Sequence, residues 1–314
     1  MSTDNRVQTA ARPLLGVALM ALGVGILPVM DGLAKHLSAE YHVVQVTWAR
    51  YLFHFVLLAA LLLWRLPLRE LLPRRLGLQI VRSAFLLSTT LCYFGAIAFL
   101  PLANALALAF IGPLVSTALA PWLLGEHAGA RRWLAVVVGF SGTLVVIRPG
   151  WAAFEWASLL GVAAGVSYGL YQLTTRRLSG SGRASVTLFY TSVFGFAVLS
   201  LVVAPFWTTP DLGGWGLMLI MGSVGALAHF LIISAFEYAP APALAPVSYM
   251  EMVSAVAVGW LVFGDFPDAF TWTGIALIVI SGLLVVSKGA TKSAFVGAGP
   301  ARERERSSRQ DSRD

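Results

Sequence analysis

The sequence predicts an all-α polytopic membrane protein with ten transmembrane helices, arranged as two inverted five-helix repeats. Three observations lead to this prediction. The chain is 58% hydrophobic and only 12% charged, whereas soluble domains average about 25% charged residues. Its apolar residues fall into ten runs of the length that a bilayer requires. Short motifs of the first half also recur in the second half, which indicates an internal duplication.

The ten apolar runs follow a polar segment, residues 1–12, which we expect to be a cytoplasmic N-terminus. Each run is close to the roughly 20 residues that a spanning helix needs, and the short connections predict antiparallel neighbours. After the last run, residues 288–314 are polar and predict a disordered cytoplasmic tail. The runs cover residues 13–37, 43–64, 76–99, 102–124, 132–148, 155–176, 184–206, 213–237, 242–263 and 269–287.

The 22 Lys and Arg residues predict which side of the membrane each connection faces. Cytoplasmic loops are enriched in these residues, so the N-terminus is placed inside. In that orientation 19 of them fall inside, Arg82 included, only Lys35 and Arg148 fall outside, and Arg50 lies within a run. The pattern predicts an even number of spans with both termini cytoplasmic. The net charge of +7 follows this topology and does not indicate a nucleic-acid partner.

Matched motifs place the two halves of the chain in register. Gly125-Glu126 recurs as Gly264-Asp265, 139 residues later. Each half contains five helices, and because five is odd, the second copy is inverted relative to the first. Inverted repeats are typical of secondary transporters, which bind their substrate near the bilayer midplane between the halves. The two predicted repeats cover residues 13–148 and 155–287.

An acid, Glu251, lies inside the apolar stretch 244–263. Such a residue is costly in hydrocarbon and is a functional-site hypothesis by default. Ser248, Glu251 and Ser254 share one helix face, which fits a cavity or a tight helix contact better than lipid. Glu251 is either a substrate ligand or proton carrier, or a structural acid bonded to a neighbouring helix. At an offset of 138 residues it matches Pro113, where we expect a kink.

His229 is the natural partner of Glu251, because each lies eleven residues from a turn near Pro240. Antiparallel helices would then place both at similar depth, about 16 Å from the turn. A His–Glu pair could exchange protons near neutral pH and so couple transport to a proton gradient. The alternative is that the two side chains lie at one level but face different ways.

Asp31 and Arg50 form a second matched pair, nine and ten residues on either side of Glu40. Both charges fall within predicted spans, so pairing would relieve two desolvation costs at once. We therefore expect a structural or gating ion pair. The alternative is direct contact between Arg50 and an anionic substrate.

Further candidates lie on other predicted helices. Tyr168 and Gln172 share a face in the run 155–176 and are expected to line a cavity. Tyr93 in the third run and Asn104 at the start of the fourth are additional candidates. Three glycines in the run 155–176 predict close helix packing: Gly161, Gly165 and Gly169.

The chain lacks the common signatures of enzymes and metal sites. It has no HExxH, GxSxG, P-loop or CxxC motif, and its five histidines show no metal spacing. We therefore expect no metal, no cofactor and no ATP-driven pump within this chain. The single Cys excludes an internal disulfide framework.

Motifs from both halves match one known pattern. They include Met30-Asp31, Pro101-Leu102-Ala103-Asn104-Ala105, Gly112-Pro113, His229-Phe230, Leu244-Ala245-Pro246 and Phe263-Gly264-Asp265. Together with Tyr249 and Glu251, they resemble the drug/metabolite transporter superfamily, EamA type, across essentially all ten helices. The resemblance implies alternating access and transport of small organic solutes across a bacterial inner membrane. It adds Tyr249 to the candidate residues.

The sequence thus predicts secondary-active transport of a small organic metabolite, such as an amino acid or a nucleoside-like or vitamin-like solute. The lipid bilayer and this solute are the expected partners. A proton coupled through Glu251 and His229 is the expected driving ion, with sodium as the alternative. Two other classes stay open: a membrane-embedded enzyme, and a non-transporting receptor or scaffold. Substrate identity, direction of transport and a homodimeric state are not fixed.

Overall fold

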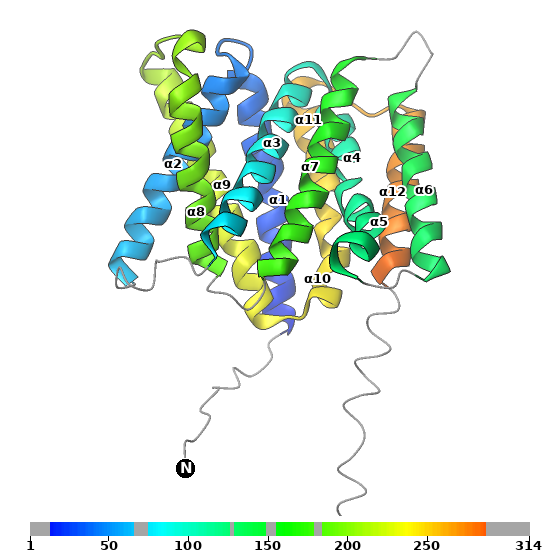
Figure 1. The fold of residues 1–314 in the computed structure, drawn as a ribbon. Coiled ribbons are helices and arrows are strands. Elements are labelled where there is room, and N and C mark those ends of the chain that lie inside the picture. The colour runs from blue at the N-terminus through cyan, green and yellow to red at the C-terminus, as the bar shows by residue number, and fades with distance from the viewer. Residues whose placement is uncertain (1–12, 66–74, 126–128, 149–154, 179–183, 287–314) are drawn as a thin grey trace, which may run out of the picture.

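The computed structural model of the chain describes residues 13–65, 75–125, 129–148, 155–178 and 184–286. The predicted cytoplasmic N-terminus and disordered tail therefore lie outside the described residues. Helices fill nearly all of the described part, and it contains no strand. The all-α prediction is confirmed. Figure 1 shows the helices standing side by side in one bundle.

Twelve α-helices form ten membrane-length rods in the described chain, because α4 continues into α5 and α10 continues into α11. Successive rods alternate in direction (Figure 1), so the second set of five runs inverted to the first. The helices are α1 (Pro13–Leu37), α2 (Val43–Arg65), α3 (Leu76–Phe99), α4 (Leu102–Ala109), α5 (Gly112–Leu124), α6 (Ala130–Ile147), α7 (Ala157–Leu178), α8 (Ala184–Val202), α9 (Leu212–Tyr238), α10 (Ala241–Ser248), α11 (Met250–Phe263) and α12 (Ala269–Val286).

The rods have the length and composition of membrane spans. Seven are long and apolar enough to cross a bilayer, including the combined rods Leu102–Leu124 and Ala243–Phe263. Two apolar helices are shorter, Val186–Val202 and Ala269–Leu284. The remaining rod, α7, is rich in glycine and polar residues, as expected for a helix that faces other helices more than lipid.

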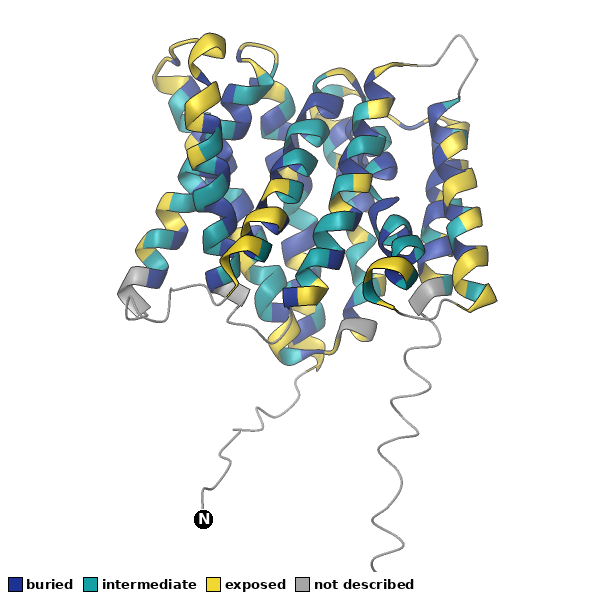
Figure 2. Cartoon of the chain, viewed as in Figure 1, coloured by how far each residue is buried: buried dark blue, intermediate teal, exposed yellow. Residues whose placement is uncertain are grey.

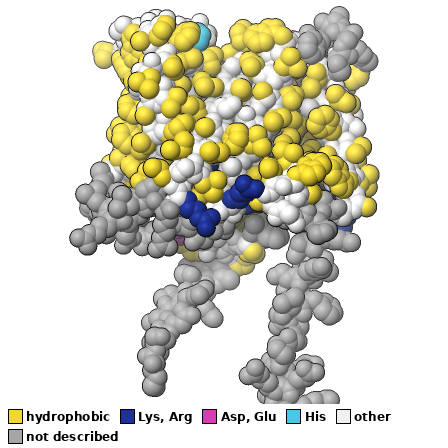
Figure 3. All heavy atoms as spheres, viewed as in Figure 1, with side chains coloured by type: hydrophobic (Ala, Val, Ile, Leu, Met, Phe, Trp, Pro, Cys, Tyr) yellow, Lys and Arg dark blue, Asp and Glu magenta, His cyan; other side chains and the backbone are white. Residues whose placement is uncertain are grey.

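The outside of the bundle is apolar. Leu201 and Leu261, for example, are 84% and 76% exposed. Hydrophobic side chains cover the sides of the face seen in Figure 3, and Lys and Arg side chains gather towards its lower end. Figure 2 shows that the buried residues lie on the inward sides of the helices. An apolar surface this extensive marks a partner other than water, and the chain is a polytopic membrane protein.

The two composite rods break at matched positions of the two repeats. The first break is near Phe110, and the second is at Tyr249, 139 residues later. Pro113 and Pro246 lie close to the breaks, and each lacks the N–H that would continue the helical ladder. The sequence indicated a kink only at Pro113, so the break in the second repeat is an addition from the structure.

Glycines of α7 let the second repeat approach these breaks. A Cβ added to Gly169 would lie 2.7 Å from the carbonyl oxygen of Gly112 and 2.8 Å from the Cβ of Val115. A Cβ on Gly165 would lie 2.9 Å from the carbonyl oxygen of Leu108. These distances are shorter than van der Waals contact, so only glycine permits this packing. The predicted role of the glycines in close packing is observed.

We expect Gly169→Ala to destabilise the protein, because the added methyl would press on the backbone of α5. Overpacking of this kind costs about 1–3 kcal/mol. The measurement is the melting temperature of the purified protein in detergent. Gly216→Ala is the matched control, since a Cβ there meets no atom within 4 Å. Equal melting temperatures for the two variants would contradict the packing argument.

We call the end of the bundle where α1 begins at Pro13 the lower end, and the end where α1 finishes at Leu37 the upper end (Figure 1). At the upper end, Lys35 of the first repeat forms an ion pair with the second repeat. Its Nζ lies 3.0 Å from a carboxylate oxygen of Asp265 and donates to the carbonyl oxygen of Leu100 at 2.9 Å. Lys35 therefore links α1, the α3–α4 junction and the residues that follow α11.

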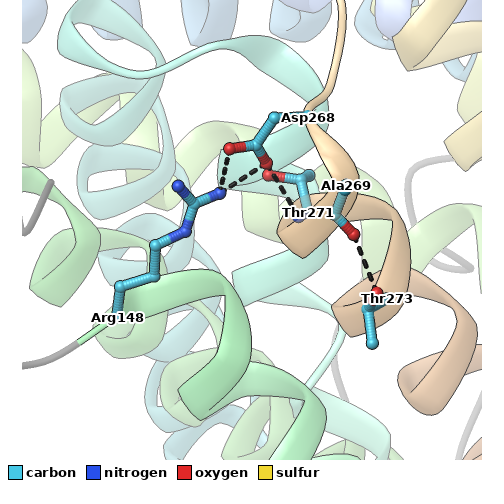
Figure 4. A network of polar contacts seen from close by, with 5 residues as sticks. All are labelled: Arg148, Asp268, Ala269, Thr271 and Thr273. Carbon is cyan, nitrogen blue, oxygen red and sulfur yellow. Dashed lines mark hydrogen bonds and ion pairs between the residues drawn. The ribbon is translucent and has the colours of Figure 1, made fainter.

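A second ion pair joins α6 to α12 at the upper end, between Arg148 and Asp268 (Figure 4). Asp268 also accepts a hydrogen bond from the backbone N–H of Thr271 at 2.9 Å, which caps the start of α12. The hydrogen bond from Arg148 is the main reason why the pKa of Asp268 falls from its ordinary 3.8 to about 2. Asp268 thus stays ionised at physiological pH.

Candidate functional site

A cavity of about 660 Å³ lies inside the bundle, between helices of both repeats. Its volume falls in the range of small-molecule sites. Part of its wall is apolar, formed for example by Phe110, Ile232 and Phe236. The ionisable and polar side chains that line it are Asp31, Arg50, Arg82, Thr89, Thr90, Tyr93, Tyr168, Tyr171, Gln172, Thr175, Thr187, His229, Ser248 and Glu251.

The cavity extends towards the lower end of the bundle and is closed at the upper end. Its lining includes Leu178, the last residue of α7, and Thr187 in the first turn of α8. At the upper end, Ile97, Leu100 and Leu102 do not line it. Each of these side chains is at most 3% exposed. They form a packed apolar layer between the cavity and the upper surface.

The carboxylates lie on one wall of the cavity, which α1 and α11 form. Asp31 is 3% exposed and accepts a hydrogen bond from the hydroxyl of Tyr93 at 3.2 Å. Glu251, in the first turn of α11, interacts electrostatically with Asp31. Ser254 donates to the carbonyl oxygen of Gly25 at 2.5 Å and so fixes α11 against α1. This contact holds the two acids near each other.

Arg50 reaches the cavity from α2. It is 7% exposed, and one Nη donates to the hydroxyl of Thr90 at 2.8 Å. Its Nε is buried without a hydrogen-bond partner in the described part of the chain. The guanidinium carbon lies 5.7 Å from the centre of the Phe94 ring. Arg50 is therefore a cation held in a fixed position, with an Nε–H that is still available as a hydrogen-bond donor.

Arg82 reaches the cavity from α3, nearer the lower end. Its Nε donates to Thr175 at 2.8 Å, and its two Nη atoms donate to Thr191 at 2.7 Å and to the hydroxyl of Tyr171 at 2.5 Å. It is 5% exposed and its guanidinium lies 4.4 Å from the centre of the Tyr171 ring. These neutral groups orient the guanidinium but leave its charge uncompensated.

His229 reaches the cavity from α9. Its ring packs edge-on against that of His54 on α2, with centroids 5.5 Å apart. Its Nδ1 is 2.8 Å from the carbonyl oxygen of Gly225. Arg50 interacts electrostatically with both histidines. His54, which the sequence did not single out, is thus part of the same polar cluster.

Most of the predicted site residues surround this cavity. Two do not line it, Tyr249 and Asn104. The Tyr249 hydroxyl occupies the space beside Gly282 on α12, where an added Cβ would lie 1.3 Å from it. The predicted residues that line the cavity are Asp31, Arg50, Tyr93, Tyr168, Gln172, His229, Ser248 and Glu251. Their roles remain predictions.

The two predicted pairs are not formed as direct contacts. Among the described residues, no ion pair within 4.0 Å joins Asp31 to Arg50. Asp31 bonds Tyr93 instead, and Arg50 bonds Thr90. His229 and Glu251 line one cavity, but the hydrogen bonds of the described chain do not join them.

Arg82 is the main cavity residue that the sequence reading misplaced, since its positive charge assigned it to the cytoplasmic boundary. A signal was available in α3. Arg82, Thr89 and Tyr93 lie at spacings of seven and four residues and so share one face. A polar stripe that extends three helical turns into an apolar run indicates a cavity face.

Comparison with known families agrees with this architecture. The EamA-like transporter family matches residues 12–148 and 155–287. The two matches cover one five-helix half of the bundle each, and together they cover most of the chain.

Several curated bacterial proteins are similar over most of their length. The S-adenosylmethionine uptake transporter of Rickettsia bellii is 26% identical over 272 residues, 87% of this chain and 93% of that protein. The riboflavin transporter of Vibrio cholerae is 28% identical over 286 residues, covering 90% and 96%. The pseudopaline exporter of Pseudomonas aeruginosa is 29% identical over 273 residues, covering 85% and 94%.

A solved crystal structure shares the fold, with a TM-score of 0.60 and 18% sequence identity over 86% of this chain and 96% of that one. The matched family and the named relatives are transporters of small molecules, not enzymes. The sequence prediction of a small-metabolite transporter is confirmed at this level, and the enzyme alternative is excluded. The chain belongs to the EamA-like transporter family.

Proposed function

We propose that the chain moves its metabolite through the central cavity by alternating access between the two repeats. The observation that carries this proposal is the cavity itself. It is large enough for a small metabolite, it is lined by ionisable groups from both repeats, and it is sealed at the upper end only. A site shared between inverted halves can be exposed to either side when the halves tilt.

The orientation of the chain follows from its charges. Among the described residues, the arginines near helix ends lie mainly at the lower end, namely Arg75, Arg131, Arg132, Arg176 and Arg177. Such residues favour the cytoplasm. We therefore place the lower end and both termini in the cytoplasm of a bacterial cell, with the bundle in the inner membrane. The structure then corresponds to an inward-facing state.

The transport is proposed to be secondary active, with a proton as the coupling ion and Glu251 as its carrier. Glu251 is a carboxylate at the cavity wall with no ion-pair partner within 4.0 Å in the described chain. His229 is its proposed titratable neighbour across the cavity. Sodium is the alternative coupling ion. Relatives include both an uptake transporter and an exporter, so direction is decided by the gradient in each cell.

The test combines ligand binding with flux. Purified protein is screened by thermal shift against metabolites that include S-adenosylmethionine, riboflavin and the standard amino acids, since a bound ligand raises the melting temperature by mass action. Each hit is then assayed for entry into proteoliposomes. Tyr168→Ala should weaken the hit, whereas Leu201→Ala on the lipid-facing surface should not. Absence of both binding and flux across the panel, with folded protein, would reject the proposal.

A further inference from the structure

The cavity is lined by two acidic side chains and two arginines. Asp31 and Glu251 are acids, and Arg50 and Arg82 are bases. Among the described residues, none of them has an ion-pair partner within 4.0 Å. Burying a charge that lacks a partner costs several kcal/mol of desolvation free energy. Charged residues of this kind inside a membrane protein usually belong to a functional site.

The protein forms ion pairs readily elsewhere. At the upper end, Lys35 pairs with Asp265 and Arg148 pairs with Asp268. Among the described residues, the buried charges therefore lie in the cavity, where a solute can supply the missing partners.

The four charged side chains lie at different depths in the cavity. Asp31 lies beside Tyr93 at the deep end of the cavity, whereas Arg82 lies eleven residues earlier on the same helix as Tyr93. At the helical rise this separation is about 16 Å towards the lower end. Arg50 lies between them, because it bonds Thr90 on α3. Glu251 lies lower than Asp31, because Ser254, one turn further up α11, bonds Gly25, which comes six residues before Asp31 on α1. A solute in the cavity thus meets an acid at its deep end and a base towards the lower end.

The guanidinium groups are prepared to bind an anion. Four hydrogen bonds to Thr175, Thr187, Thr191 and Tyr171 hold Arg82 in place. Arg50 keeps a buried Nε without a partner in the described chain, and a guanidinium fork matches a carboxylate well.

Resting on the proposed transport function, we infer that the substrate is amphoteric. It carries a cationic group, which Asp31 binds at the deep end, and a carboxylate or similar anion, which binds between Arg50 and Arg82. The apolar wall with Phe110 and Phe236 contacts the body of the solute.

The experiment measures binding of matched solute sets to the unaltered protein by thermal shift. Phenylalanine and methionine are each compared with an analogue whose carboxylate is removed or amidated and with an analogue whose amine is acetylated. S-adenosylmethionine, whose sulfonium stays positively charged after acetylation, is compared only with its decarboxylated analogue. We expect at least one parent to bind, and loss of either charge to weaken it about tenfold or more, as for lost charged hydrogen bonds. Analogues that bind as tightly as their parents would overturn the inference.

Variants of the protein then show which side chain binds which charged group of the solute. Arg50→Gln should weaken a parent but leave its carboxylate-free analogue unchanged, and Asp31→Asn should weaken the parent but leave the acetylated analogue unchanged. A purely structural role would shift all three solutes alike. The analogue series needs no variant, so it decides the question even where a variant does not fold.

The outcomes separate this inference from the proposed function. Transport confined to neutral or singly charged solutes, such as riboflavin alone, would leave the transport proposal standing and reject the amphoteric substrate. Failure of every solute to bind or cross would reject the transport proposal itself.

Discussion

Glu251→Gln is expected to abolish uptake that is driven by a pH gradient while substrate exchange continues. Glutamine has nearly the shape of glutamate but cannot take up or release a proton. Because Glu251 lies in the first turn of α11, beside the break and on the cavity wall, the change removes a titratable group without removing volume. Net uptake should fall to the level of liposomes that contain no protein.

The measurement uses proteoliposomes and a labelled substrate, first with an imposed pH gradient and then as counterflow with no gradient. Glu155→Gln is the matched control, since it is the same chemical change at an exposed position outside the cavity. Full pH-driven uptake by Glu251→Gln would exclude Glu251 as the proton carrier. Uptake that follows a sodium gradient in both proteins would favour sodium as the coupling ion.

The second large effect is expected from the ion pair between Lys35 and Asp265. Lys35 also donates to the carbonyl oxygen of Leu100, and its Nζ lies 5.1 Å from the centre of the Phe263 ring. These contacts join the two repeats above the closed end of the cavity. Lys35→Ala removes all of them, so the population should shift towards a state that is open at the upper end.

Labelling from the outside reports this shift. Ala109, a cavity-lining residue, is replaced by Cys in a Cys92→Ser background, and a membrane-impermeant maleimide is added to the outer face. Since partly exposed ion pairs contribute up to about 1 kcal/mol, labelling should become severalfold faster in Lys35→Ala. Lys35→Arg, which keeps the charge, is the control. An unchanged labelling rate would show that this contact does not hold the upper end closed.

Particular residues show how far the sequence predicted the site. Glu251 and His229, which the sequence singled out as a possible site, line the cavity, because a charge or imidazole inside an apolar run is costly wherever the helix packs. Their partners were not predictable in this way. Asp31 was expected to pair with Arg50, yet it bonds Tyr93, because the rotation of each helix about its axis decides which neighbours meet.

The structure places Tyr249 and Arg82 differently from what the sequence alone indicates. Tyr249 follows the family motif, but its hydroxyl lies against Gly282 outside the cavity lining. Arg82 matched the composition of a cytoplasmic boundary, but Thr175, Thr191 and Tyr171 hold it at the cavity wall. Both depend on contacts between residues far apart in the sequence.

The sequence by itself determined the helical class, the approximate spans and the inverted duplication, because hydropathy and motif spacing are properties of the chain that need no partner. The tertiary structure decided which helix faces meet. Packing placed Gly169 against Gly112 and Lys35 against Asp265, closed the upper end and left four charges unpaired in one cavity. Such arrangements depend on relative helix rotation and depth, which are set by side-chain contacts between helices and not by local periodicity.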